Sequence, residues 1–287
     1  MRALILGNLG MLGQDLVRSA PRYVTVALAS EPGLRCDITD PAALSRVFDR
    51  SEPDVVINAA GYTAVDRAED EPDKAFDANA RGVACVSRLC ADRAIAVVHF
   101  STDYVFSGRS ERPYREADVP DPSSVYGKSK LLGEREFAKS GADGIVIRTQ
   151  WLFGEQGRSF PATMLDRARS RMPTRVVDDQ FGRPTYSADL AGWTWELAAR
   201  RARGIVHAAN DGQASWYDVA RVIFDREGAG ECLRPCRTAD YPTRAPRPAY
   251  SVLDISKLKT LIGPVPTWED ALTRFLATTS RARSLTP

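Results

Sequence analysis

A tyrosine and a lysine four positions apart, Tyr126 and Lys130, are the side chains of this sequence best suited to proton transfer. On a helix this spacing places both on one face, so the ammonium can lie beside the phenol and lower the phenol's pKa from about 10. Tyr126 is then a candidate proton donor near neutral pH. The alternative is an exposed helix start with a solvated lysine, because a chain with nine tyrosines forms such pairs by chance.

The order of three features favours the chemical interpretation. A glycine-rich turn, Gly7-x-x-Gly10-x-x-Gly13, directly follows the first apolar run of the chain. A later apolar run ends in Ser101-Thr102-Asp103, and the segment with Tyr126 comes after it. This order predicts one catalytic site assembled from a nucleotide-binding turn, a strand-end hydroxyl and a helix with a proton donor.

The composition is that of an ordinary globular protein. The 39 Lys and Arg residues nearly balance the 37 Asp and Glu residues, and these charges are interspersed, so no nucleic-acid partner is expected. Five cysteines without a Cys-x-x-Cys pair, and only two histidines, argue against a zinc site and favour a reduced, cytoplasmic protein. No apolar run reaches membrane length, and the first residues are too short for a signal segment, so we expect no membrane association.

Short apolar runs alternate with helical stretches along the first half of the chain. The sequence predicts strands at residues 3–6, 24–28, 55–58, 96–101 and 144–148, with helices over 10–20, 40–49 and 73–93 and another that carries Tyr126. Strands that are apolar on both faces and separated by helices indicate a parallel sheet covered on both sides. The expected fold class is therefore α/β, with a doubly wound (Rossmann) parallel sheet.

This alternation weakens after Trp151, where the sequence becomes richer in proline and arginine. We expect residues 1–150 to form a cofactor-binding domain, joined by strands near 174–190 and 204–210. Residues 151–287 are expected to form mainly a smaller substrate-binding domain, built from discontinuous segments.

The glycine turn is the candidate site for a dinucleotide. Glycines let the backbone turn tightly and approach a pyrophosphate, whose charge meets a helix N-terminus. The spacing is typical of extended short-chain dehydrogenase/reductases, although a plain flexible turn is the alternative. The predicted cofactor-binding residues are Gly7, Gly10, Met11, Leu12 and Gly13 in the turn, Asp37 and Ile38 near adenine, the strand-end run Ala60, Gly61, Tyr62 and Thr63, and also Tyr126 and Lys130. Asp37 could instead only cap a turn.

The second strand bears on which dinucleotide binds. NAD-selective folds place a carboxylate at the end of this strand, where this chain has Ala29. With Ser30 and Arg35 nearby, the absence of an acid favours a 2′-phosphate. The expected cofactor is therefore NADPH, with NADH as the alternative.

Several blocks together resemble the dTDP-4-dehydrorhamnose reductase family. They are Ala64-Val65-Asp66-x-Ala68-Glu69, Ser101-Thr102-Asp103-Tyr104-Val105-Phe106, Val125-Tyr126-Gly127-x-x-Lys130, Arg148-Thr149-x-Trp151, Asp179-Gln180-Phe181-Gly182-x-Pro184-Thr185 and Arg247-Pro248-x-x-Ser251-x-Leu253. The resemblance runs from the first strand to about residue 260. It implies reduction of the 4-keto group of a dTDP-6-deoxy-sugar with NAD(P)H, the step that gives dTDP-L-rhamnose.

The resemblance also implies roles for single residues. Thr102, Tyr126 and Lys130 would be catalytic: Tyr126 would protonate the C4 oxygen, Lys130 would lower its pKa and hold the nicotinamide ribose, and Thr102 would hydrogen-bond the same carbonyl. The positions that match substrate contacts are Thr102, Asp103, Tyr104 and Trp151, with a core aromatic as the alternative for Trp151 and a strand-end turn for Asp103. Asn79 matches a position that supports the site in many short-chain reductases, or is an ordinary helix residue.

Two positions depart from the family's pattern. Met11 stands where the family usually has glutamine, and Ser159 stands where it commonly has asparagine. No cluster of acidic residues that could bind Mg²⁺ is identifiable, so no metal ligand is assigned. A homodimer is possible, and the sequence leaves the oligomeric state open. Arg158, Arg183 and Arg244 are candidate partners for a substrate diphosphate, although each could be a solvated surface charge.

Two alternatives to the leading function remain. One is a reductase of another nucleotide-activated 4-keto-deoxy-sugar, serving an antibiotic or glycan pathway. The other is a non-catalytic nucleotide-binding subunit, like the regulatory subunit of methionine adenosyltransferase, which resembles this family. Intact Thr102, Tyr126 and Lys130 favour an enzyme.

Overall fold

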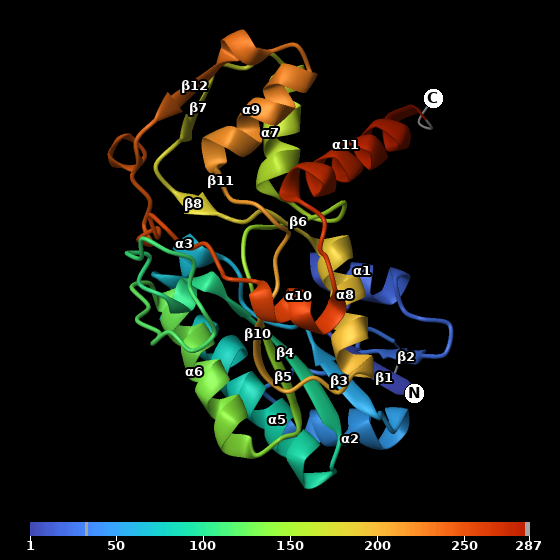
Figure 1. Cartoon of the computed structure of the whole chain (residues 1–287). Coiled ribbons are helices and arrows are strands. Elements are labelled where there is room, and N and C mark those ends of the chain that lie inside the picture. Colours follow the sequence, from blue (N-terminus) through green and yellow to red (C-terminus); the bar gives the residue numbers. More distant parts are fainter. Residues whose placement is uncertain (32–33, 285–287) are drawn as a thin grey trace.

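Six parallel strands form the central sheet of the computed structural model, which describes residues 1–31 and 34–284 (Figure 1). The strands are β1 (Arg2–Leu6), β2 (Thr25–Leu28), β3 (Val55–Asn58), β4 (Ala96–Thr102), β5 (Gly144–Thr149) and β10 (Gly204–His207). Their order is β10-β5-β4-β3-β1-β2, and every neighbouring pair is parallel. The predicted doubly wound α/β fold is confirmed, and the run near 204–210 joins the sheet as expected.

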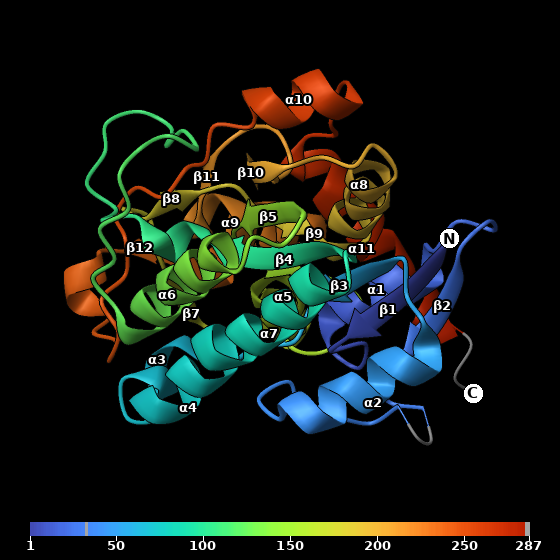
Figure 2. The same ribbon diagram turned by 90° about the horizontal axis from the view of Figure 1, so that it is seen from below.

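Helices cover both faces of this sheet, which Figure 2 shows between two helical layers. One layer holds α1 (Met11–Arg18), α8 (Ser187–Ala199) and α10 (Ser256–Ile262). The other holds α2 (Pro41–Ser51), α5 (Gly82–Asp92) and α6 (Val125–Ser140). Successive residues of β1 serve opposite layers: Ile5 packs in the core with Leu16, whereas Leu4 packs in the core with Phe48. This two-sided burial explains why the strands are apolar throughout.

Short elements complete the first half and carry residues discussed below. They are α3 (Val65–Ala68), α4 (Pro72–Phe76), the π-helical turn η1 (Asp77–Arg81) and the 3₁₀ turn η2 (Asp103–Val105). The helix expected over 73–93 is thus interrupted by η1, which contains Asn79. The helix expected over 40–49 is α2, and the Asp40 side chain caps it by accepting hydrogen bonds from the backbone N–H groups of Ala42 and Ala43 at 2.9 and 3.0 Å.

The later segments build a second, smaller unit at the top of Figure 1 with its own apolar core. Its helices are α7 (Phe160–Arg169), α9 (Trp216–Arg226) and α11 (Trp268–Ser284), with the 3₁₀ turns η3 (Gly230–Cys232) and η4 (Thr238–Asp240). Its strands are β6 (Leu152–Phe153), β7 (Thr174–Val177), β8 (Phe181–Gly182), β9 (Thr185–Tyr186), β11 (Ala214–Ser215) and β12 (Leu233–Cys236). The expectation that strands near 174–190 join the central sheet is wrong, because these strands lie in separate two-stranded sheets. In these sheets β7 pairs in parallel with β12, β6 pairs in parallel with β9, and β8 pairs antiparallel with β11.

The described residues contain no group of three His, Cys, Asp or Glu side chains that could hold a metal ion. Within those same ranges, no helix has the length and apolar character needed to cross a bilayer.

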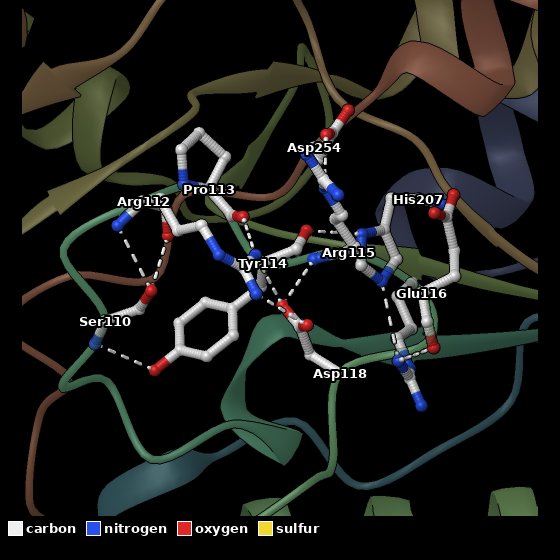
Figure 3. A network of polar contacts seen from close by, with 10 residues as sticks. Ser110, Arg112, Pro113, Tyr114, Arg115, Glu116, Asp118, His207 and Asp254 are labelled. Carbon is white, nitrogen blue, oxygen red and sulfur yellow. Dashed lines mark hydrogen bonds and ion pairs between the residues drawn. The ribbon is translucent and has the colours of Figure 1, made fainter.

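A buried ion pair fastens α6 to the central sheet. The Arg148 guanidinium on β5 donates to both carboxylate oxygens of Glu134 on α6, at 2.8 and 2.7 Å, and lies 5.0 Å from the ring centre of Phe106. His207 is buried beside it, and burial together with the charge of Arg148 lowers the pKa of this imidazole to about 3. The neutral ring can therefore donate from Nδ1 to the Tyr114 carbonyl oxygen, 3.1 Å away, and accept at Nε2 from Arg148. Figure 3 shows how Tyr114 and His207 thereby hold the loop that leads to α6.

Removing the cation of this pair should cost much stability, because it leaves a buried carboxylate without a partner. We expect Arg148→Met to lower the free energy of unfolding by about 3–5 kcal/mol, measured by urea denaturation followed by circular dichroism. The matched control is Arg88→Met, which breaks the exposed pair of Arg88 with Glu136 on the same helix and should cost about 1 kcal/mol or less. Equal losses for the two variants would contradict this interpretation.

Candidate active site

The glycine turn lies at the carboxyl end of β1, where the chain enters α1. Gly7 has a φ of +77°, and a Cβ at this position would lie 2.5 Å from the backbone nitrogen of Ala60. A Cβ on Gly13 would lie 2.2 Å from the Gly7 carbonyl oxygen. Only glycines therefore let α1 start this close to the turn, with Met11 and Leu12 in its first turn, so that its N-terminal N–H groups can meet a pyrophosphate.

A cavity of about 510 Å³ adjoins this turn. Its lining includes the predicted cofactor residues Gly7, Asp37, Ile38, Ala60, Gly61 and Tyr62. Gly10, Met11, Leu12, Gly13 and Thr63 are not part of that lining. The Asp37 carboxylate accepts hydrogen bonds from the backbone N–H and the hydroxyl of Thr39, at 2.9 and 2.8 Å. Asp37 therefore caps a turn, which was the alternative to its role near adenine. The glycine turn and this cavity thus lie side by side at the carboxyl ends of β1 and β3.

The end of β2 places three candidates for cofactor choice in the same cavity. Ala29, Ser30 and Arg35 all line it, and the Asn8 amide donates to the Ser30 hydroxyl at 2.7 Å. The sequence had not pointed to Asn8. No carboxylate takes the position of Ala29, so a 2′-phosphate would meet a hydroxyl and a guanidinium instead of a like charge.

This arrangement predicts the effect of an acid at Ala29. Ala29→Asp should shift the ratio of kcat/KM for NADPH and NADH towards NADH by more than about tenfold, because the carboxylate repels a 2′-phosphate. The measurement is steady-state kinetics with each cofactor. Ala29→Asn has the same size without the charge and should change the ratio little; a matching shift in both variants would show that charge does not set the preference.

Tyr126 and Lys130 lie on the first turns of α6, as their spacing predicted. The Ser124 side chain caps this helix by accepting from the backbone N–H of Gly127 at 3.1 Å. Thr102 ends β4, and Lys130 is buried with its ammonium donating to the carbonyl oxygen of Phe100 on that strand at 2.6 Å. The strand end and the helix start are thus joined directly through the lysine.

The electrostatics differ from the sequence-based expectation. Burial raises the pKa of the Tyr126 phenol to about 12, although a hydrogen bond with the Thr102 hydroxyl acts in the opposite direction. Burial also lowers the pKa of the Lys130 ammonium to about 8. In this arrangement Lys130 does not lower the pKa of Tyr126, because both groups are desolvated and the ammonium points at the Phe100 carbonyl. That role of Lys130 stays a prediction for the enzyme with bound cofactor and substrate. Spacing along a helix fixes a shared face, but not the burial of that face.

Asp103 and Tyr104 lie beside the catalytic candidates. The Thr102 hydroxyl donates to one Asp103 carboxylate oxygen at 3.0 Å, whereas the other oxygen is buried without a partner among the described residues. Burial raises the pKa of this carboxyl to about 6, against hydrogen bonds from Ser251 and Thr102. The Tyr104 ring meets the Tyr126 ring edge-on, with centroids 5.6 Å apart. The Asp103 carboxylate is therefore enclosed beside Thr102, and its contact with a substrate stays a prediction.

Trp151 is half-buried and packs on an aromatic residue of the second unit, and its contact with the sugar stays a prediction. Its ring stacks on Trp216, with centroids 3.6 Å apart and planes 10° apart, and lies against Gly182. Trp216 lines the substrate-sized cavity described next, but Trp151 does not.

A cavity of about 640 Å³ lies where the second unit faces the Tyr104 region. Its lining includes Asp66, Tyr104, Phe160, Trp216 and Tyr241 and three cations, Arg167, Arg175 and Arg247. None of the three arginines suggested by the sequence lines it. Arg183 pairs with Asp211 at 3.1 Å, Arg244 pairs with Asp70, and Arg158 is exposed. The one sequence signal that could have pointed here is the motif that begins at Arg247.

Asn79 is a supporting residue rather than an ordinary helix position. Its side-chain oxygen accepts from the Tyr62 N–H at 2.9 Å, and its amide donates to the Tyr62 carbonyl and the Ser129 hydroxyl, both at 3.0 Å. It thus joins the cofactor-side strand end to α6, next to Lys130. His99 is buried in β4 and belongs to the core.

A glycine turn entering a helix, a strand-end threonine and a helical Tyr-x-x-x-Lys pair define a nucleotide-dependent reductase of the extended short-chain dehydrogenase/reductase class. Comparison with known proteins specifies this class further. The family described as "RmlD substrate binding domain" matches residues 1–281, and the chain belongs to this family.

Relatives and solved structures agree with this family. The dTDP-4-dehydrorhamnose reductase of Aggregatibacter actinomycetemcomitans is 40% identical, over 94% of this chain and 97% of that protein. A dTDP-4-keto-6-deoxy-D-glucose reductase of Streptomyces niveus is 36% identical, over 96% and 97%. The crystal structure of dTDP-4-dehydrorhamnose reductase from Bacillus anthracis in complex with NADP has a TM-score of 0.90 and 32% identity, and covers 96% of this chain and 99% of that one.

Proposed function

We propose that this chain uses NADPH to reduce the 4-keto group of a dTDP-4-dehydro-6-deoxy-sugar, with dTDP-4-dehydrorhamnose as the substrate and dTDP-L-rhamnose as the product. The observation that carries the proposal is the position of Thr102, Tyr126 and Lys130. They gather at the carboxyl edge of the sheet, where the cofactor turn also lies, and Tyr126 contacts Tyr104 in the wall of the larger cavity. The B. anthracis reductase, bound to NADP, supports the choice of cofactor.

Each residue then has a chemical task. Bound NADPH supplies the hydride that adds to C4. Tyr126 donates its phenolic proton to the C4 oxygen, and its raised pKa keeps the phenol protonated at neutral pH. Lys130 remains mostly an ammonium below pH 8, so it can bind the nicotinamide ribose and stabilise the tyrosinate that remains. The Thr102 hydroxyl orients the carbonyl.

The larger cavity suits the remainder of the substrate. Arg167, Arg175 and Arg247 can meet the diphosphate, and the aromatic rings of Phe160 and Trp216 can contact the base. Arg175 and Arg247 are paired with Asp240 and Asp66, at 3.2 and 2.6 Å, so a diphosphate would compete for them. Arg167 forms no ion pair with another residue of the described part of the chain and is the strongest candidate.

The experiment is NADPH oxidation with a panel of 4-keto-sugars. We expect efficient turnover of dTDP-4-dehydrorhamnose and a loss of useful kcat/KM when the nucleotide is removed, because nucleotide binding positions C4. Efficient reduction of a free 4-keto-sugar would contradict the nucleotide-sugar assignment. Tight NADPH binding without turnover of any member of the panel would favour a non-catalytic binding subunit.

A second candidate is a reductase of another dTDP-4-keto-sugar, and the relative in S. niveus supports it. So does Ser159, which caps α7 by accepting from the Ala162 N–H at 3.4 Å where the family commonly has asparagine. Rapid turnover of dTDP-4-keto-6-deoxy-D-glucose beside poor turnover of dTDP-4-dehydrorhamnose would favour it. A homodimer also remains a prediction, which light scattering tests.

A further inference from the structure

The short segment from Asp66 to Glu71 touches both the second unit and the helix that carries Tyr126. It contains the end of the Ala64–Glu69 motif, for which the reaction itself gives no role. The segment consists of α3 and the turn that leads into α4. Its acidic side chains have different partners: Asp66 and Asp70 contact residues 244–247, and Glu69 contacts the start of α6.

Asp66 holds the chain at the rim of the larger cavity. One of its carboxylate oxygens accepts from the backbone N–H of Ala245 at 3.1 Å, and the other accepts from Arg247 at 2.6 Å. Arg247 also donates to the Ala245 carbonyl at 3.2 Å, and its side chain is only 18% exposed. Next to this contact, Arg244 pairs with Asp70. Residues 244–247 are therefore fastened to the segment at several points.

Glu69 points the other way, to the start of α6. Its carboxylate accepts from the backbone N–H of Val125 at 2.9 Å, one residue before Tyr126. The first N–H groups of a helix have no partner within the helix, and an anion there is also favoured by the helix dipole. Ser124 satisfies the N–H of Gly127, so Glu69 and Ser124 together fix the first turn of α6.

We propose that Glu69 is a positioning residue for Tyr126, and that Asp66 couples the placement of residues 244–247 at the cavity rim to this position. The inference rests on the proposed reductase function. When Arg247 and its neighbours contact a bound nucleotide-sugar, the same short segment keeps Tyr126 aligned with C4 of the sugar. A displacement of about 1 Å at such a donor is enough to lower turnover strongly.

Single variants test the first half of this proposal. We expect Glu69→Ala to lower kcat about tenfold at nearly unchanged KM for NADPH, whereas Glu69→Gln should keep most of the activity because its amide oxygen can accept the same hydrogen bond. Glu136→Ala removes a carboxylate of α6 that pairs with Lys139 and Arg88, two residues outside the proposed active site, and should leave kcat unchanged. Wild-type turnover by Glu69→Ala would overturn the positioning role.

A double-variant cycle tests the coupling. Asp66→Ala should lower kcat and also raise KM for the sugar nucleotide, since it frees residues 244–247. If both acids act through one segment, the double variant should lose clearly less than the product of the two single losses in kcat. Multiplicative losses would overturn the coupling. The two proposals fail in different ways. If only the coupling is wrong, the wild-type protein still reduces its dTDP-keto-sugar. If the wild-type protein reduces no dTDP-keto-sugar, the proposed function itself is refuted.

Discussion

Tyr126→Phe is expected to lower kcat by about 10²- to 10⁴-fold, with the affinity for NADPH little changed. The substitution removes only the hydroxyl that donates the proton, and loss of a positioned proton donor costs this much. The ring would still meet Tyr104 edge-on, so the packing of the site is preserved. Steady-state kinetics with dTDP-4-dehydrorhamnose, together with a fluorescence titration of NADPH, gives both quantities.

Lys130→Met provides the comparison for this result. One ammonium is proposed to serve both the tyrosinate and the nicotinamide ribose, so this variant should lose turnover and NADPH affinity together. Near-normal turnover by Tyr126→Phe would remove Tyr126 from the mechanism. A normal NADPH affinity in Lys130→Met would remove the ribose contact.

Gly13→Val should abolish measurable NADPH binding while the protein remains folded. Even the first carbon of a side chain at this position would come within 2.2 Å of the Gly7 carbonyl oxygen and 2.6 Å of the Asn8 Cα. Both neighbours are backbone atoms, so α1 must move away from the turn and its N-terminus can no longer reach the pyrophosphate. Fluorescence titration measures the binding, and circular dichroism measures the fold.

The matched control for this variant is Gly192→Ala on α8. A Cβ at Gly192 would meet no atom within 4 Å, so this variant should bind NADPH like the wild type. If a folded Gly13→Val protein also keeps normal affinity, the glycine turn has no part in cofactor binding.

The parts of the fold with strong local signals could be predicted from the sequence. Apolar runs alternating with helical stretches predicted the central sheet and its helices, because these patterns depend on nearby residues. The partner of β7 could not be predicted in this way. Four residues do not specify whether they pair with the central sheet or with β12, which lies almost sixty residues further on.

The same distinction holds for the site. Short motifs predicted the glycine turn, Thr102 and the helix that carries Tyr126. The structure places Thr102 next to that helix. Of the cations of the larger cavity, Arg247 belongs to a quoted motif, whereas Arg167 and Arg175 do not. Residues from α7, β7 and the stretch around 247 meet only in three dimensions. Arg183, a candidate from the sequence, is instead taken up by Asp211 and the Leu253 carbonyl oxygen. The sequence shows that a residue is a positively charged arginine, but the partner of that charge depends on which residues lie beside it in the folded chain.

The central claim is that this chain transfers hydride from NADPH to C4 of a dTDP-keto-sugar. The most direct measurement uses NADPH deuterated at the transferable C4 position of its nicotinamide, with dTDP-4-dehydrorhamnose as substrate and NMR analysis of the product. We predict dTDP-L-rhamnose with deuterium at C4 of the sugar and loss of this product in Tyr126→Phe. Recovery of unreduced dTDP-4-dehydrorhamnose, or of a product without deuterium at C4, would contradict the account.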